Sequence, residues 1–188
     1  MLSAQLKEQT KVNHQLLEKK LVAQMRSIQN KEDYSKLLNS FYSFFGGLEI
    51  LMSKHEVLSF LTDQSQRRKS SALANDLNHL DAHLPNLATQ ESLPVITNYL
   101  QIIGVMYVME GSTLGGKYIA KMIQSQLNSS DCEGLSFFNS YGENTENMWQ
   151  IFKESIDGIH LNQTDSDTVV LAANDTFQHF SNWFDQIS

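Results

Sequence analysis

Hydrophobic positions in this chain recur at helical spacing, and the alternation typical of strands is scarce. Its two prolines, Pro85 and Pro94, lie in one central stretch, so the segments on either side are free to form long helices. The pattern predicts helices over residues 3–28, 31–55, 66–80, 95–127, 146–160 and 166–187. With no internal repeat and no long linker, these elements predict an all-α fold, a single-domain helical bundle over residues 1–188.

Capping residues and apolar runs refine this prediction. Asn30 precedes an acidic first turn, which favours a helix start. Ser92 followed by Pro94 predicts the start of the fourth helix. The second helix is apolar nearly all round between residues 41 and 52, so it should lie at the centre of the bundle.

Four glycines lie within thirteen residues of the fourth predicted helix. Each glycine inside a helix costs about 1 kcal/mol relative to alanine, so the cluster needs a reason. At about 3.6 residues per turn, Gly104, Gly111 and Gly115 share one narrow face, with Val108 between them and Ser112 at its edge. Such a face lets a flat ligand approach the backbone, or lets another helix pack against it. The spacing alone leaves both interpretations open.

A histidine lies on the apolar stripe of the first predicted helix. That stripe consists of Leu2, Leu6, Thr10, Leu17, Leu21, Met25 and Ile28. His14 shares the face, and Glu18 follows one turn later, where it can orient the imidazole. One ring nitrogen would then be free to bind a metal, although a lone histidine on an apolar face is more often a core residue. Lys7 and Lys11 lie near the same face, to pair with ligand carboxylates or to stay solvated.

Three motifs together resemble the haem oxygenase family. The motif Thr-Lys-x-x-His-x-x-x-Glu at 10–18 is similar to the helix that carries the proximal iron ligand. The run Tyr-Val-x-Glu-Gly-Ser-Thr-Leu-Gly-Gly at 107–116 resembles the glycine-rich distal helix, in particular that of bacterial members. Thr-Phe at 176–177 and Trp-Phe at 183–184 resemble aromatics of the haem pocket. The matches follow the family's order and span nearly the whole chain.

This resemblance implies a haem-oxygenase-like bundle that opens haem to biliverdin, carbon monoxide and ferrous iron, using O₂ and external electrons. Haem, with its iron, would be both cofactor and substrate. His14 would bind the iron, and Gly111, Ser112 and Gly115 would form the catalytic distal side. The other expected haem contacts are Lys7, Lys11, Glu18, Val108, Gly116, Lys153, Phe177 and Phe184. Many members carry an aspartate after the first distal glycine, whereas this chain, like the bacterial proteins it resembles, has Ser112.

Electrons must come from outside, because the chain has no flavin or nicotinamide motif. The expected donor is a ferredoxin, a flavoprotein reductase or a small reductant. The sequence leaves open which meso carbon is attacked, and whether the product feeds a bilin-accepting photoreceptor or accompanies iron release. It also leaves open an alternative function, a non-catalytic haem- or bilin-binding carrier or sensor of the same fold.

The composition of the chain limits which binding partners and which cell compartment are expected. The chain carries 14 lysines and arginines against 21 acidic residues, which argues against nucleic acid as the main partner. It has no apolar run of about 20 residues and no signal-like start, so a cytoplasmic protein without membrane contact is expected. The single cysteine, Cys132, excludes an internal disulfide.

Two other enzyme classes fit the sequence poorly. Non-haem di-iron oxidases need several Glu-x-x-His ligands, and the chain has none. The nearest candidate is Asp76-x-x-His79, with His83 one turn further on, in a polar segment expected to be solvated. A cysteine nucleophile is disfavoured because Cys132 lies in a polar loop without an apparent base.

Overall fold

The computed structural model describes residues 1–55, 60–127 and 134–187, and no strand occurs in this part of the chain. The helices are α1 (Leu2–Gln9), α2 (Lys11–Arg26), α3 (Lys31–Met52), α4 (Ser71–His79), α5 (Tyr99–Gly111), α6 (Thr113–Gln126), α7 (Ser136–Asn139), α8 (Thr145–Asp157) and α9 (Gln163–Ile187), with short 3₁₀ turns η1 (Gln64–Gln66) and η2 (Gly142–Asn144). The predicted all-α fold is confirmed.

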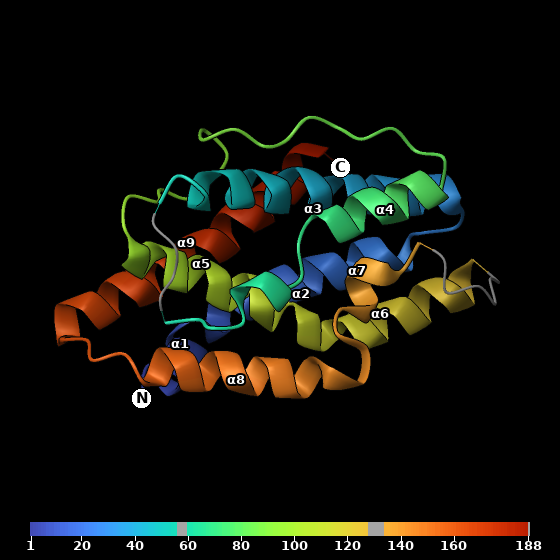
Figure 1. Cartoon of the computed structure of the whole chain (residues 1–188). Helices are drawn as coiled ribbons and strands as arrows, with labels where there is room; N and C mark the ends of the chain where they lie inside the picture. The colour runs from blue at the N-terminus through green and yellow to red at the C-terminus, as the bar shows by residue number, and fades with distance from the viewer. Residues whose placement is uncertain (56–59, 128–133, 188) are drawn as a thin grey trace.

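Figure 1 shows how these helices are layered. Helices α3 and α4 lie along one side of the molecule, and α1 and α8 lie along the opposite side. Between them, α5 packs along α9, and α2 contacts both α9 and α6. The short α7 fills the space between α4 and α6. Buried side chains from all of these layers form one continuous core.

Two of the predicted helices are each broken in two. The first is interrupted at Thr10, whose hydroxyl donates to the Leu6 carbonyl at 2.8 Å. The fourth is interrupted at Ser112, whose hydroxyl donates to the Met109 carbonyl at 2.6 Å. Hydroxyl side chains that bond to carbonyls one turn back bend helices, which gives both breaks a local cause.

Several helix boundaries also differ from the prediction. The expected start at Ser92 and Pro94 is wrong, because α5 begins only after Asn98, which forms a capping box with Gln101. The short α7 was not predicted, and α4 begins at Ser71, five residues later than expected. The predicted cap is confirmed at Asn30, whose side chain accepts from the Asp33 amide at 2.9 Å.

The prediction that α3 lies at the centre of the bundle is confirmed only for its aromatic face, because the helix lies along one side of the molecule and Ile50 is 54% exposed. Phe41 makes edge-to-face contacts with Phe137 of α7 and with Phe180 and Phe184 of α9. Phe44 stacks on Phe180, with ring centroids 4.6 Å apart. Aromatic pairs at these separations add to the stability that burial provides. The aromatic cluster therefore joins three helices that are far apart in sequence.

Asp76 corrects one expectation from the sequence. It is fully buried rather than solvated, and its carboxylate accepts bonds from the amides of Ser136 and Phe137 at 2.8 and 2.9 Å. Asp76 therefore caps the start of α7, while His79 and His83 are exposed. No group of three or more potential metal ligands forms among the described residues. Cys132 lies outside the described residues.

Candidate functional site

His14 is the exposed member of an otherwise largely buried stripe. The side chain of His14 is 58% exposed, whereas Leu6, Thr10 and Leu17 on either side are buried. Its ring meets the buried Phe177 of α9 edge-on, with centroids 5.6 Å apart. The stripe therefore faces the core everywhere near His14 except at His14 itself.

One ring nitrogen of His14 faces an acidic side chain. Nδ1 lies 3.9 Å from the Glu18 carboxylate, which is close enough for charge interaction but too long for a hydrogen bond. Nε2 has no hydrogen-bond partner among the residues that the structure describes. An accessible imidazole of this kind can serve as a metal ligand.

The glycines of the predicted flat face have different surroundings. A side chain at Gly104 would collide with the Val169 carbonyl, so this glycine permits α5 to approach α9. A side chain at Gly111 would meet only the Trp149 ring, at 3.7 Å, and one at Gly115 would enter open space. The helix-packing interpretation is therefore correct for Gly104, whereas Gly115 leaves backbone accessible.

Other expected site residues are divided between surface and core. Lys7 and Lys11 are exposed near His14 in the chain, and Lys153 lies 6.0 Å from the centre of the Trp149 ring. Val108 is buried in α5. Two residues are accounted for by contacts within the protein. Gly116 packs against the Phe138 backbone and Phe184 lies in the aromatic core, so both face other parts of the protein rather than open space.

A buried network of polar side chains that includes Glu110 of α5 was not predicted from the sequence. Arg67 Nη1 donates to Glu110 at 2.9 Å and to the Met148 carbonyl at 2.8 Å. Its Nε and Nη2 atoms donate to the two oxygens of Asp63 at 2.9 and 2.6 Å. Glu110 also accepts from the Tyr141 hydroxyl, at 3.0 Å. Arg67 is thereby paired with two carboxylates.

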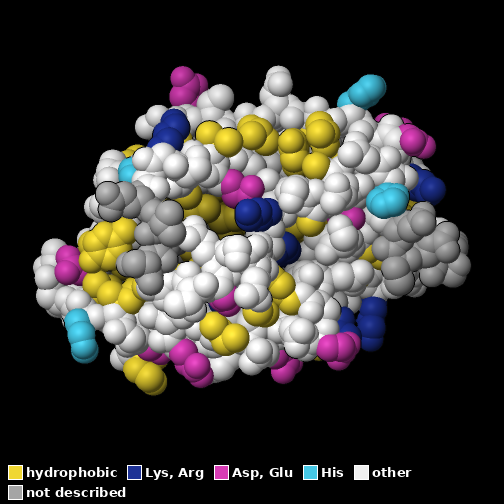
Figure 2. Space-filling view, viewed as in Figure 1, with side chains coloured by type: hydrophobic (Ala, Val, Ile, Leu, Met, Phe, Trp, Pro, Cys, Tyr) yellow, Lys and Arg dark blue, Asp and Glu magenta, His cyan; other side chains and the backbone are white. Residues whose placement is uncertain are grey.

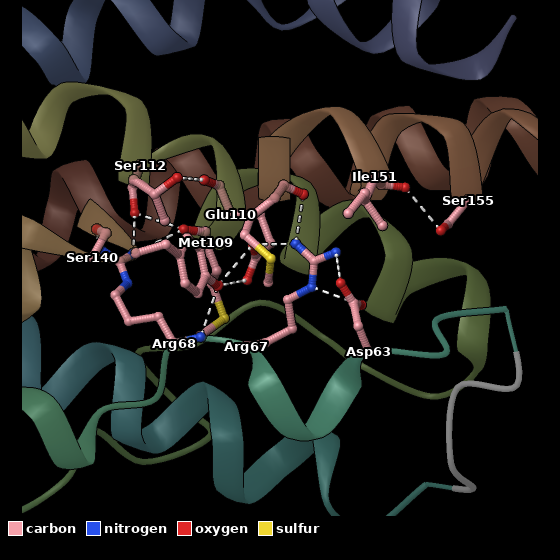
Figure 3. Close-up of polar contacts among 12 residues, drawn as sticks. Asp63, Arg67, Arg68, Met109, Glu110, Ser112, Ser140, Ile151 and Ser155 are labelled. Carbon is pink, nitrogen blue, oxygen red and sulfur yellow. Dashed lines mark hydrogen bonds and ion pairs between the residues drawn. The ribbon is translucent and has the colours of Figure 1, made fainter. Parts of the chain in front are cut away.

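Arg68 extends this network to the other side of Gly111. Its Nη2 atom donates to Ser112 Oγ at 2.6 Å and to the Met109 carbonyl at 3.0 Å (Figure 3). Its backbone amide donates to the Tyr141 hydroxyl at 2.7 Å. In the sequence, the Arg-Arg pair is typical of a solvated charge cluster, because nothing near it in the chain indicates its partners.

Burial shifts the protonation equilibria of this network. Loss of hydration raises the pKa of Glu110, against the opposing effect of Arg67. Burial also raises the pKa of Tyr141 to about 12, and the nearby Glu110 carboxylate adds to the shift. Desolvation lowers the pKa of Arg68 to about 10, which still leaves it protonated at neutral pH.

One face of the molecule carries side chains of mixed character. Figure 2 shows a hollow in this face where apolar side chains are visible, with acidic and basic side chains close to its edge. Charges of both signs are interspersed over the same face.

Among the described residues, no helix is both long and apolar enough to cross a lipid bilayer.

The fold and the site define an all-α bundle with an accessible histidine on one helix and exposed glycine backbone on another. The family model for haem oxygenases matches residues 1–186. The chain therefore belongs to the haem oxygenase family and is, by that membership, a haem-degrading oxidoreductase. A curated relative, haem oxygenase of Rhodella violacea, is 26% identical over 195 aligned positions, which cover 94% of this chain and 83% of the relative.

Solved structures agree on the fold. The NO- and CO-bound haem oxygenase of Neisseria meningitidis superposes with a TM-score of 0.85 at 19% identity, covering 100% of this chain and 92% of that one. The haem oxygenase of Leptospira interrogans gives 0.80 at 19% identity, covering 98% of each chain. Haem oxygenase-1 of the cyanobacterium Synechocystis, solved in complex with haem, gives 0.79 at 20% identity, covering 100% and 92%.

Proposed function

We propose that this chain binds haem between α2 and the α5–α6 pair and opens it to biliverdin, carbon monoxide and ferrous iron. The observation that carries the proposal is the exposure of His14 on a stripe whose neighbours are buried. A neutral imidazole in that position suits haem iron. Glu18, 3.9 Å from Nδ1, would favour the tautomer that leaves Nε2 free as the ligand atom.

The residues present fit a flat, apolar ligand with two propionates. Gly115 has open space where a side chain would stand, and Gly111 has only the Trp149 ring nearby, so a ring can come close to this backbone. Phe177 supplies an apolar wall beside His14. Lys7 and Lys11 are exposed and free to reach carboxylates, and Lys153 is a third candidate for the same role.

When bound, haem supplies the redox chemistry, including the activation of O₂ at its iron. The protein's task is to hold the ring, to exclude bulk water and to leave room on the glycine side. Gly111 and Gly115 provide that room. Ser112 directly follows Gly111 and would place a water molecule on that side.

The electron donor is an external protein or reductant, since the sequence holds no motif for a flavin or nicotinamide. A ferredoxin and a flavoprotein reductase are the two donor classes to compare. Parallel turnover with each, at equal reducing potential, would identify the better partner.

One experiment separates the enzyme from a carrier of the same fold. Purified protein is loaded with haem without oxygen, then given air and a reductant, and followed by visible absorption. We expect loss of the haem spectrum, appearance of biliverdin and release of carbon monoxide. Reversible cycling between ferric and ferrous haem, with no biliverdin formed, would instead identify a carrier. Chromatography of the product would also give the bilin isomer and hence the meso carbon attacked.

A further inference from the structure

Two consecutive arginines hydrogen-bond to the residues immediately before and after Gly111. Arg67 bonds to Glu110 on one side, and Arg68 bonds to Ser112 on the other. Figure 3 shows both arginines extending from the same short segment, between η1 and α4, toward the α5–α6 break. That break is therefore held by a segment more than 40 residues earlier in the chain.

The guanidinium of Arg68 has little freedom to move. Nη2 donates to Ser112 and Met109, and Nη1 donates to the Phe137 carbonyl at 3.2 Å and to Ser140 Oγ at 3.1 Å. Each terminal nitrogen carries two N–H groups, so these four bonds use all of them. The guanidinium carbon also lies 3.8 Å from the centre of the Phe137 ring, where a cation is attracted to the ring face. Arg68 thus fixes Ser112 relative to α7.

The two arginines differ in how their charges are compensated. Arg67 contacts the carboxylates of Asp63 and Glu110 at 2.6 and 2.9 Å. Arg68, in the part of the chain that the structure describes, bonds its side chain only to uncharged carbonyl and hydroxyl oxygens. The carboxylates of Glu110 and Glu49 interact with Arg68 electrostatically but do not hydrogen-bond to it. A partly buried cation that is not directly ion-paired still acts on its surroundings, because the protein interior screens charge weakly.

The bonds to Arg68 and Met109 also determine which hydrogen bonds the Ser112 hydroxyl can still form. Its proton is donated to the Met109 carbonyl at 2.6 Å, and one lone pair accepts from Arg68. One acceptor position remains, so Ser112 can receive a bond from a water molecule but has no proton to give. In place of the acidic side chain that many family members carry, this chain presents a neutral acceptor with a cation behind it.

We propose that Arg68 is a positioning residue for the distal side, fixing Ser112 as an acceptor, and that its charge favours anionic ligands on the haem iron. The inference rests on the proposed function, because it requires the ligand side of the haem to face Gly111 and Gly115. A role in packing alone would give Arg68 no preference between anionic and neutral ligands.

The test compares an anionic with a neutral iron ligand. Azide affinity of the ferric haem complex and carbon monoxide affinity of the ferrous complex are measured by visible titration at fixed pH and ionic strength. In Arg68→Met we expect azide affinity to fall on the order of tenfold, as for loss of one nearby unit charge at reduced dielectric, with carbon monoxide affinity changed much less. Arg68→Lys keeps the charge and should retain most of the azide affinity.

Two further variants complete the comparison. Arg68→Gln removes the charge but keeps a donor for Ser112, so it carries the test if Arg68→Met fails to fold, and it should also lose azide affinity selectively. Arg26→Met is the control, because Arg26 is an exposed residue in the last turn of α2. It should match the native protein in both titrations.

Three results would overturn the inference. These are equal losses of azide and carbon monoxide affinity in the neutral variants, unchanged azide affinity in them, or a loss in Arg68→Lys as large as in Arg68→Met. Failure of the proposed function has a different signature. The native chain would then not form a histidine-ligated haem complex, or would form one that yields no biliverdin.

Discussion

Ser112 accepts a 2.6 Å hydrogen bond from Arg68, which lies 44 positions earlier in the chain. The bond connects the residue after Gly111 to the segment between η1 and α4. It changes the role expected for Ser112, because the hydroxyl is already engaged by an arginine and by the Met109 carbonyl. Ser112 can then orient a water molecule only as an acceptor.

Replacing His14 tests the proposed iron ligand. His14→Ala should lose the histidine-type haem spectrum and at least about a hundredfold of turnover, since even the outer partners of metal ligands are worth 10–100-fold. Resonance Raman spectra of the ferrous complex and initial rates of biliverdin formation provide the measurement. His79→Ala, at an exposed position of α4, is the control. A native iron–histidine signal in His14→Ala would assign the ligand to another residue.

Two glycine substitutions separate the open position from the packed one. Gly115→Ala places a methyl group in open space and should raise the unfolding free energy of the haem-free protein by about 0.5–1 kcal/mol through helix propensity. Gly104→Ala forces a methyl group against the Val169 backbone and should lower it by about 1–3 kcal/mol. Urea denaturation of both variants, with the native protein alongside, provides the comparison.

Gly115 is also predicted to limit how closely haem can approach α6. Gly115→Ala should change O₂ affinity or the bilin isomer composition, and Gly115→Leu should prevent haem binding. Titration of the haem-free proteins with haem measures this directly. Native haem affinity in Gly115→Leu, combined with native stability, would mean that the ring does not approach this part of α6.

Removing the Ser112 hydroxyl should slow ring opening while leaving haem affinity near native. The Arg68 donor left without its partner should also lower stability by about 1–3 kcal/mol. Ser140→Ala is the matched control, because Ser140 accepts from the other terminal nitrogen of Arg68, at 3.1 Å, on the α7 side. Single-turnover rates from the oxygenated complex decide the question. Equal slowing in both variants would show that the effect comes from Arg68 packing rather than from Ser112.

Tyr141 should contribute to loss of stability at alkaline pH. The folded protein keeps the Tyr141 proton up to about pH 12, whereas the unfolded chain releases it near the ordinary tyrosine value of 10.0. Between these values the folded state binds more protons, so the unfolding free energy falls as pH rises. Tyr141→Phe removes this contribution and should show a shallower decline over that interval.

Tyr141→Phe should also have a lower unfolding free energy than the native protein at pH 8, by about 1 kcal/mol, because it loses the hydrogen bonds of the Tyr141 hydroxyl. Urea denaturation between pH 8 and pH 12 measures both effects. Tyr118→Phe, at a residue that is 77% exposed, should follow the native curve throughout. A Tyr141→Phe curve parallel to the native one would mean that Tyr141 ionises alike in the folded and unfolded states.

The sequence by itself determined the all-α fold and the family of the chain. Helical periodicity located the long helical segments among the described residues, though not the breaks at Thr10 and Ser112, and the cap at Asn30 was correct, because both depend on residues close together in the chain. The placement of His14 on the apolar stripe followed from the same spacing. The three motifs, in order along the chain, predicted the family to which the chain belongs.

Tertiary structure decided which of these positions remain accessible and which polar groups meet. Spacing placed Gly104 and Gly115 on one face, but only the position of α9 shows that Gly104 is packed while Gly115 is open. Likewise, the burial of Asp76 depends on α7, 60 residues away. Arg68 meets Ser112 only because the segment before α4 packs against the α5–α6 break. Helical periodicity specifies which side of a helix is apolar, whereas contacts between distant segments depend on how the whole bundle packs.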